Sequence, residues 1–191
     1  MTHEPGAPIQ GWNTLALGPI EIERVGMDIR RLEMDAVPEL WRINEEGLPG
    51  VGKVTEAAMG DLLSLAELPL GVFEGGELLG FVICLLPRTR YGSLNYAWFN
   101  ERYDQFLYVD RIAVAEAHRN RQVGGLLYAR VIEEADKLGV PIAAEVSLQP
   151  PNPGSMRFHD RHDFSEVGVL HHGKQSVTML LREWTGTAQR T

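Results

Sequence analysis

The 191-residue sequence is poor in three features, and each shortage excludes a class of protein. Cys84 is its only cysteine, so no disulfide can form within the chain, and we expect a reducing compartment such as the cytoplasm. No apolar run approaches the length of a membrane span, and residues 1–13 lack the charged and apolar segments of a signal peptide. Basic residues are not in excess: the formal net charge of −8 argues against a nucleic-acid partner.

What the sequence does contain predicts one globular domain. Hydrophobic residues make up 44% of the chain, and its length suits a single domain with a sizeable core. We assign this domain to residues 20–191. Residues 1–19 hold three prolines and several glycines and are expected to form a loose arm.

The order of the expected elements predicts a mixed α/β fold. Period-two and β-rich segments predict strands at residues 20–25, 70–73, 79–86, 106–114, 142–148, 164–170 and 175–181. Helical spacing predicts helices at 34–44, interrupted by Pro38, at 55–68, ended by Pro69, and at 124–138 and 155–162. We therefore expect early helices followed by a mostly antiparallel sheet with one helical crossover.

Residues 106–132 read as a strand, a basic glycine-bearing loop and a helix. Gly124 and Gly125 stand in the first helical turn, where they cost stability unless something must approach the backbone closely. A phosphate is the usual ligand of a helix N-terminus, and Arg119 and Arg121 would add charge-assisted hydrogen bonds. The other interpretation is a tight turn with solvated arginines, and the spacing alone favours neither.

The connection at residues 87–104 is too long and too aromatic for a plain linker. We expect its aromatic side chains to cover the substrate; they are Tyr91, Tyr96, Trp98, Phe99 and Tyr103. The alternative is a small satellite core packed beneath the loop.

Two motifs resemble those of the GNAT acyltransferase superfamily. Its acyl-CoA-binding motif reads Arg/Gln-x-x-Gly-x-Gly/Ala between a strand and a helix, and Arg119 and Gly124 match it. Gln122 stands where the family usually has its first glycine. The second motif reads Asn-x-x-Ala/Ser-x-x-Leu/Phe-Tyr and ends in Gly-Phe.

This second motif lies downstream, separated from the first by a helix and a strand. The matching residues are Asn152, Ser155, Phe158 and Phe164. His159 takes the usual tyrosine position and Asp163 the usual glycine position. The resemblance extends over roughly residues 70–181, and more narrowly the chain is similar to an uncharacterised-looking bacterial branch of acetyltransferases.

The resemblance implies a GNAT fold, in which helices flank a mostly antiparallel, splayed sheet of about seven strands. It also implies acetyl-CoA as cosubstrate, with the pantetheine arm between two parting strands and an oxyanion held by a backbone N–H near Ala113 or Val114. The residues it assigns to cofactor binding are Ile112, Ala113, Val114, Arg119, Asn120, Arg121, Gln122, Val123, Gly124, Gly125, Asn152, Ser155, Phe158 and His159.

Three residues are candidates for proton transfer. Glu145 is the candidate base, unless a neighbouring strand or an arginine satisfies its carboxylate. Asp110 is the rival base and should share a strand face with Ile112 and Val114, unless it forms an ion pair with Arg111 or another local cation. His159 is the candidate acid, or else it packs beside the CoA sulfur while water supplies the proton.

The histidines do not predict a metal site. His159 and His162 have a possible ligand spacing, but no cysteine joins them, and histidines in turns and on surfaces are the common case. We expect no metal.

The leading hypothesis is an N-acetyltransferase that acylates a primary amine. The acceptor would be a small-molecule amine or a peptide N-terminus, without nucleic-acid or membrane partners, and a homodimer is possible because dimers are common in the family. Two alternatives stay open: a non-catalytic acyl-CoA-binding regulatory module, and a generic nucleotide-binding protein that uses the helix N-terminus.

Overall fold

The computed structural model describes residues 26–173 and 175–186. The loose arm expected at residues 1–19 and the strand expected at residues 20–25 lie outside this range.

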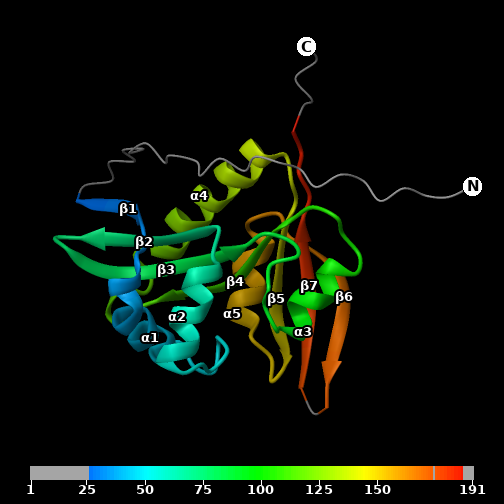
Figure 1. The fold of residues 1–191 in the computed structure, drawn as a ribbon, viewed down its shortest axis with the longest axis horizontal. Coiled ribbons are helices and arrows are strands. Elements are labelled where there is room, and N and C mark those ends of the chain that lie inside the picture. Colours follow the sequence, from blue (N-terminus) through cyan, green and yellow to red (C-terminus); the bar gives the residue numbers. More distant parts are fainter. Residues whose placement is uncertain (1–25, 174, 187–191) are drawn as a thin grey trace, which may run out of the picture.

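The described chain builds one seven-stranded sheet (Figure 1). Its strands are β1 (Met27–Arg31), β2 (Leu68–Glu74), β3 (Glu77–Leu85), β4 (Leu107–Val114), β5 (Ile142–Gln149), β6 (Ser165–His172) and β7 (Gln175–Arg182). Their spatial order is β1-β2-β3-β4-β5-β7-β6. Every neighbouring pair is antiparallel except β4 and β5, which are parallel. The mixed, mostly antiparallel sheet is therefore confirmed.

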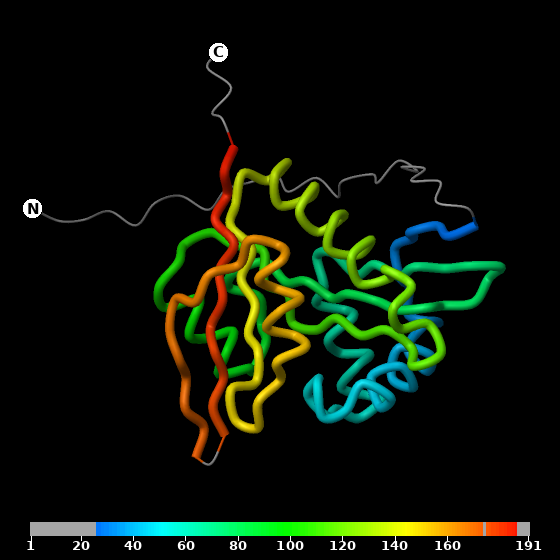
Figure 2. Tube along the Cα trace, turned by 180° about the vertical axis from the view of Figure 1, so that it is seen from behind, coloured from blue at the N-terminus to red at the C-terminus, as the bar shows by residue number. Residues whose placement is uncertain are grey.

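Helices cover both faces of this sheet. They are α1 (Val37–Glu46), α2 (Glu56–Leu65), α3 (Leu94–Asn100), α4 (Val123–Leu138) and α5 (Pro153–Asp160), with 3-10 turns at η1 (Met34–Ala36) and η2 (Glu116–His118). Helices α1, α2 and α3 lie on one face, and α4 and α5 lie on the other, which is nearer the viewer in Figure 2. The helix that joins the parallel strands β4 and β5 is α4, the single crossover that the sequence predicts.

Two details of the early helices differ from the sequence-based expectation. Pro38 does not interrupt α1 but stands in its first turn, where the missing N–H has no helical partner to lose. Helix α2 begins after Thr55, whose hydroxyl accepts a 3.1 Å hydrogen bond from the Ala58 N–H, as expected for a cap. It ends at Leu65 rather than Leu68, because the residue before Pro69 is driven into an extended conformation and opens β2.

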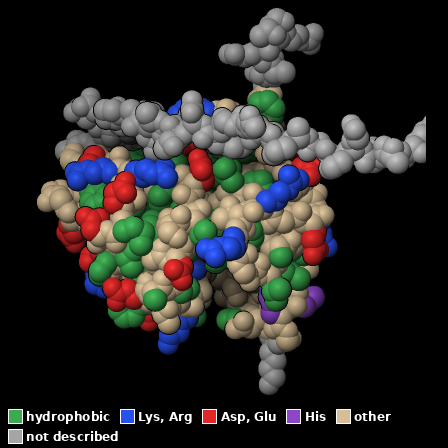
Figure 3. Space-filling view, in the orientation of Figure 1, with side chains coloured by type: hydrophobic (Ala, Val, Ile, Leu, Met, Phe, Trp, Pro, Cys, Tyr) green, Lys and Arg blue, Asp and Glu red, His purple; other side chains and the backbone are tan. Residues whose placement is uncertain are grey.

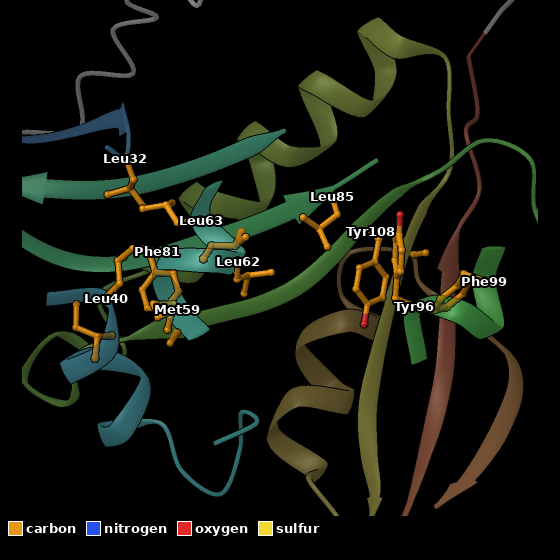
Figure 4. Close-up of a cluster of buried hydrophobic side chains, with 14 of the residues drawn as sticks. Leu32, Leu40, Met59, Leu62, Leu63, Phe81, Leu85, Tyr96, Phe99 and Tyr108 are labelled. Carbon is orange, nitrogen blue, oxygen red and sulfur yellow. The ribbon is translucent and has the colours of Figure 1, made fainter. Parts of the chain in front are cut away.

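The core has one layer on each face of the sheet. Figure 4 shows the layer beneath α1 and α2, where Leu40 and Met59 pack near Phe81, and its continuation to Tyr96 and Tyr108 near α3. The second layer is centred on the apolar face of α4; its fully buried members include Leu127, Tyr128, Val131, Val82 and Cys84.

The parallel strands β4 and β5 stay together for only a short distance. Their register contains two pairs, Leu107 with Ile142 and Tyr108 with Ala143. Beyond Tyr108 the two strands part, so the facing edge of β4 is left open toward β5. This opening in the middle of the sheet positions the site described next.

Candidate active site

Helix α4 starts from a left-handed residue. Gln122 precedes the helix with a φ of 65° and a ψ of 12°, a conformation that glycine adopts without strain and other residues rarely take. This conformation turns the chain from the loop into α4. Gly124 and Gly125 follow inside the first turn of the helix.

Neither the turn nor packing within the protein requires these two glycines. A Cβ placed on Gly125 would meet nothing within 4 Å, and one on Gly124 would meet Phe158 at 3.5 Å, an ordinary contact. Glycine inside a helix costs roughly 0.5–1 kcal/mol relative to alanine. The open space over the amides is therefore better explained by a ligand that approaches the backbone, and phosphate suits a helix N-terminus.

A cavity of about 790 Å³ lies over this helix start. Its lining combines the outer half of β4, the loop after it, the first turns of α4 and the end of α5. The residues from β4, the loop and the start of α4 are Ile112, Ala113, Val114, Asn120, Gln122, Val123, Gly124 and Gly125. Arg161 and His162 also line it from the α5 side, and the sequence had not singled out Arg161.

The two loop arginines are engaged with the protein. Arg119 donates from Nη2 to the Glu46 carbonyl oxygen at 2.6 Å, and its side chain lines the cavity. Arg121 donates from Nη2 to both carboxylate oxygens of Glu74, at 2.8 and 2.9 Å. Both side chains thus hold the loop against α1 and the β2–β3 hairpin, rather than being simply solvated.

A second cavity, of about 510 Å³, occupies the opening between β4 and β5. It reaches both faces of the sheet: Asp110, Arg111 and Glu145 line it on the α1 and α3 side, and Tyr128, Ser155 and His159 line it on the α4 and α5 side. Ile112 lines both cavities. Figure 3 shows the surface hollowed between the part that carries α1 and α2 and the part that carries α3.

Glu145 is the titratable group with the most distinctive surroundings in this cavity. Its Oε2 accepts a 2.8 Å hydrogen bond from the Tyr108 hydroxyl, and its Oε1 accepts a 2.9 Å hydrogen bond from Asn95 Nδ2. Burial and the nearby Asp110 charge raise its pKa from 4.5 to about 7, although both hydrogen bonds and Arg111 act in the opposite direction. A carboxylate with a pKa near neutrality is suited to take a proton from an amine.

Asp110 does not lie where the alternation predicts. Strand β3 pairs Ile83 with Arg111 and Cys84 with Val109, so Asp110 is the extra residue of a β-bulge. Val109 and Ile112 both pack on the α4 side of the sheet, so two residues stand between them where regular alternation would leave one. Asp110 therefore does not share a face with Ile112 and Val114, and that expectation is wrong.

The side chain of Asp110 instead pairs with its neighbour. Its Oδ2 accepts a 2.8 Å hydrogen bond from Arg111 Nε, and the two side chains are 4% and 6% exposed. Arg111 also donates to Asn44 Oδ1 on α1 at 3.0 Å. The ion pair that the sequence offered as the alternative is therefore present, and its carboxylate raises the pKa of Glu145.

His159 is buried, and both of its ring nitrogens have partners. Nε2 lies 2.6 Å from the Tyr128 hydroxyl, and Nδ1 lies 2.9 Å from the Ser155 carbonyl oxygen. Burial lowers the pKa of His159, so the ring is neutral near pH 7. A carbonyl oxygen only accepts, so Nδ1 carries the hydrogen and Nε2 accepts from Tyr128.

The remaining α5 residues have distinct positions. Asn152 caps α5 by accepting a 3.1 Å hydrogen bond from the Ser155 N–H. Ser155 lines the central cavity, and Phe158 lines the cavity over α4, where its ring stands 4.7 Å from that of Tyr128.

The aromatic connection forms a packed cluster around α3. Tyr96 and Phe99 are 2% and 0% exposed, and their rings contact Phe106 and Tyr108 of the core. Trp98 and Tyr103 pack against the same layer, half-buried. Tyr91 lies near Asp110 and Arg111, and burial raises the pKa of its hydroxyl. These contacts are those of a packed core beneath the connection, which is the alternative that the sequence leaves open.

Four polar contributors to the site escaped the sequence analysis: Asn95, Tyr108, Tyr128 and His172. Asn95 links Glu145 to His172, whose Nε2 lies 2.8 Å from Asn95 Oδ1. Tyr108 and Tyr128 occupy apolar positions in the patterns of a strand and a helix, and these patterns do not predict that their hydroxyl groups form hydrogen bonds in the site. In residues 26–173 and 175–186, no group of three or more His, Cys, Asp or Glu side chains could hold a metal ion.

The chain's relation to known proteins agrees with this geometry. Residues 28–164 match the sequence pattern of the Acetyltransferase (GNAT) family. The chain belongs to this family. No curated protein matches it. Across the part of the chain that the structure covers, no helix is both long and apolar enough to cross a membrane.

Solved GNAT structures share the fold at low sequence identity. The ribosomal-protein-S18-alanine N-acetyltransferase of Escherichia coli is 16% identical, with a TM-score of 0.65 over 86% of this chain and 98% of its own. Ard1 from Thermoplasma volcanium is 17% identical, with a TM-score of 0.68 over 85% and 100%. The protein yncA from Salmonella typhimurium, solved with its cofactor acetyl-CoA, is 16% identical, with a TM-score of 0.62 over 86% and 98%.

The departures from the GNAT motifs keep the backbone shape that the motif glycines favour. Gln122 and Asp163 replace the two expected glycines, and their φ values are 65° and 62°. Each residue thus adopts a left-handed conformation at a cost on the order of 1 kcal/mol. The shape of the loop is retained even though the residue type is not.

Proposed function

We propose that this GNAT protein transfers an acetyl group from acetyl-CoA to a primary amine by direct attack of the amine on the thioester. The observation that carries the proposal is Glu145, a carboxylate with a pKa of about 7 on the cavity between the parted strands β4 and β5. Such a group can take a proton from a bound ammonium at neutral pH.

The two cavities suit the two ends of acetyl-CoA. The open amides around Val123, Gly124 and Gly125 are suited to the pyrophosphate, and the shared residue Ile112 connects that region to the cavity between the strands. The pantetheine arm would pair with the open edge of β4, where β5 has moved away. The acetyl-CoA found in the Salmonella relative supports this choice of cosubstrate.

The acceptor amine would enter from the opposite side of the sheet. Glu145 removes a proton from the ammonium, and the neutral amine attacks the thioester carbonyl to give a tetrahedral intermediate. An N–H of the open β4 edge, near Ala113 or Val114, stabilises the oxyanion. Asp110 assists indirectly, because its charge raises the pKa of Glu145 toward the working pH.

The acceptor class is a primary amine of a small molecule or of a peptide N-terminus. The name of the Escherichia coli relative specifies an alanine of a ribosomal protein as its acceptor. An α-amine has a pKa near 8 and needs only a mild base, and a carboxylate with a pKa of about 7 meets that need.

An acetyl-transfer screen tests the proposal. Purified protein is incubated with acetyl-CoA and a panel of peptides, amino acids, polyamines and aminoglycosides, and acetylated products are detected by mass spectrometry. We expect a product for at least one amine class and its loss in Glu145→Gln. Binding of CoA, and its displacement by ATP or NAD, is measured in parallel by calorimetry.

The same measurements separate the alternatives. Binding of CoA without transfer to any amine would favour the regulatory module. Displacement of CoA by ATP or NAD would favour a nucleotide-binding protein.

A further inference from the structure

A buried phenol–imidazole pair joins the two helices on the cofactor side of the sheet. The Tyr128 hydroxyl on α4 lies 2.6 Å from His159 Nε2 on α5. Tyr128 is 0% exposed and His159 is 4% exposed. The rings of Phe158 and Phe164 stand within 6 Å of both members, with centroid distances of 4.7 and 5.8 Å to Tyr128 and of 5.6 and 5.0 Å to His159.

This pair lies across the cavity from Glu145. Tyr128 and His159 line the cavity from the α4 side, and Glu145 lines it from the α3 side. A thioester that reached this cavity from the start of α4, past Ile112, would present its sulfur on the side from which it came. With the amine attacking from the side of Glu145, the leaving sulfur would face Tyr128.

We propose that Tyr128 is the catalytic residue that protonates the departing CoA sulfur, and that His159 is a positioning residue that holds and supports the Tyr128 hydroxyl. The inference rests on the proposed acetyl transfer and assigns one step of it.

The surroundings of His159 argue against its acting as the acid itself. Its Nδ1 faces the Ser155 carbonyl of its own helix, and its Nε2 faces Tyr128, so neither nitrogen is left for the sulfur. Burial lowers the pKa of His159, and electrostatic repulsion from His162 lowers it further. Burial, Cys84 and Glu145 raise the pKa of Tyr128, so the phenol keeps its proton.

The step balances with groups that the structure contains. When the tetrahedral intermediate collapses, the C–S bond breaks and its electron pair stays on sulfur. The phenolic O–H bond of Tyr128 breaks, and its proton goes to sulfur, which gives the CoA thiol and a phenolate. The phenolate regains a proton from solvent after CoA leaves.

His159 holds the Tyr128 hydroxyl in place as a neutral ring. With the hydrogen on Nδ1, the ring donates to the Ser155 carbonyl at 2.9 Å and accepts from Tyr128. The Ser155 carbonyl keeps the ring in this tautomer, because a carbonyl oxygen only accepts. The Tyr128 O–H reaches the sulfur by rotating about its C–O bond, away from Nε2.

The ionisation of bound CoA provides a test that needs no acceptor. The difference in ultraviolet absorbance between the complexes with CoA and with desulfo-CoA is measured against pH, which reports the pKa of the bound thiol. If Tyr128 donates to the sulfur, Tyr128→Phe raises that pKa by about one to two units, the shift expected on losing a hydrogen bond to a charged atom. An unchanged thiol pKa in Tyr128→Phe overturns the proposal.

Matched variants separate the phenol from packing. Phe164→Leu disturbs the same ring cluster without removing a hydroxyl and should leave the thiol pKa unchanged. His159→Gln keeps an acceptor for the Tyr128 hydroxyl and should preserve most of the wild-type value, whereas His159→Ala should raise it. Equal effects of the two His159 variants would contradict the positioning role.

A relocated phenol gives the strictest control. The double variant Tyr128→Leu, His159→Tyr returns a tyrosine to the position that the GNAT motif prefers and should bring the thiol pKa back toward the wild-type value. If CoA fails to bind the wild-type protein, the proposed function fails with this inference. If CoA binds and Tyr128→Phe leaves the thiol pKa at the wild-type value, the proposed function stands and this inference falls.

Discussion

The Tyr108 hydroxyl donates a 2.8 Å hydrogen bond to Glu145 across the point where their strands part. Tyr108 belongs to the last paired position of β4, and Glu145 lies two residues beyond the last paired position of β5. The bond therefore spans the opening that would admit the thioester. It holds the candidate base at the cavity between β4 and β5, which residues from both faces of the sheet line.

The pKa of Glu145 predicts how acetyl transfer depends on pH. The base must be ionised to accept a proton, and its pKa is about 7, so turnover should rise with pH through that value and then level. Glu145→Gln should lower turnover by about 10²-fold or more and remove this limb of the profile. Steady-state release of CoA against pH checks both expectations, and an unchanged limb in the variant would show that another group titrates.

The same group predicts a pH-dependent stability. Its pKa in the folded protein is raised from 4.5 to about 7, so the native state favours the protonated form. This contribution to stability is fully present below about pH 4.5 and is lost as the pH rises through about 7. Urea unfolding at several pH values should show that loss in the wild type and a smaller one in Glu145→Gln. Parallel curves for the two proteins would contradict it.

Removing the Tyr108 hydroxyl should move the profile of Glu145. Its hydrogen bond holds the pKa of Glu145 lower than burial alone would. Tyr108→Phe should therefore shift the acid limb of the rate profile upward by about one unit. Phe106→Leu, another fully buried ring change on this side of the sheet, should reduce stability without the shift. A profile that moves equally in both variants would point to packing.

Gly125 should show opposite effects on stability and on binding. A Cβ there meets no protein atom within 4 Å, so Gly125→Ala should raise the free energy of unfolding by roughly 0.5–1 kcal/mol. The same methyl group occupies the space over the helix amides and should weaken CoA binding. Thermal unfolding without ligand and calorimetry with CoA measure the two effects. Stabilisation with unchanged CoA affinity would place the pyrophosphate elsewhere.

The backbone of Gln122 predicts the effect of restoring the family's glycine. At a φ of 65°, Gln122→Gly relieves strain and should stabilise the protein by roughly 0.5–1 kcal/mol while CoA binding is retained. Gln175→Gly, in the extended conformation of β7, should be destabilising instead. If Gln122→Gly abolishes CoA binding, the side chain rather than the backbone carries the function of this position.

Elements with strong local patterns can be predicted from the sequence. They include the strand, the loop and the helix around Gly124, the closing hairpin and the mixed sheet. Three features could not be read from local patterns. The bulge at Asp110 depends on its register with β3, the cap-like place of Pro38 depends on where α1 begins, and the core role of Phe99 depends on packing against β4.

The polar partners in the site were hidden for a related reason. Tyr108, Tyr128 and Asn95 become meaningful only when strands or helices distant in sequence bring them to Glu145 and His159. Their spacing along the chain carries no signal of that meeting. The motif residues, in contrast, lie close together in sequence at the start of α4 and around α5, so their pattern is visible in the sequence.

The role of Glu145 as the base is tested by amine-dependent release of CoA from acetyl-CoA by the wild-type protein and by Glu145→Gln. The measurement is made at about pH 8, where a carboxyl with a pKa near 7 is mostly ionised. We expect release that depends on an amine acceptor and falls about 10²-fold or more in the variant. If acetyl-CoA binds both proteins equally and the wild type releases CoA no faster than Glu145→Gln with any amine, Glu145 is not the base.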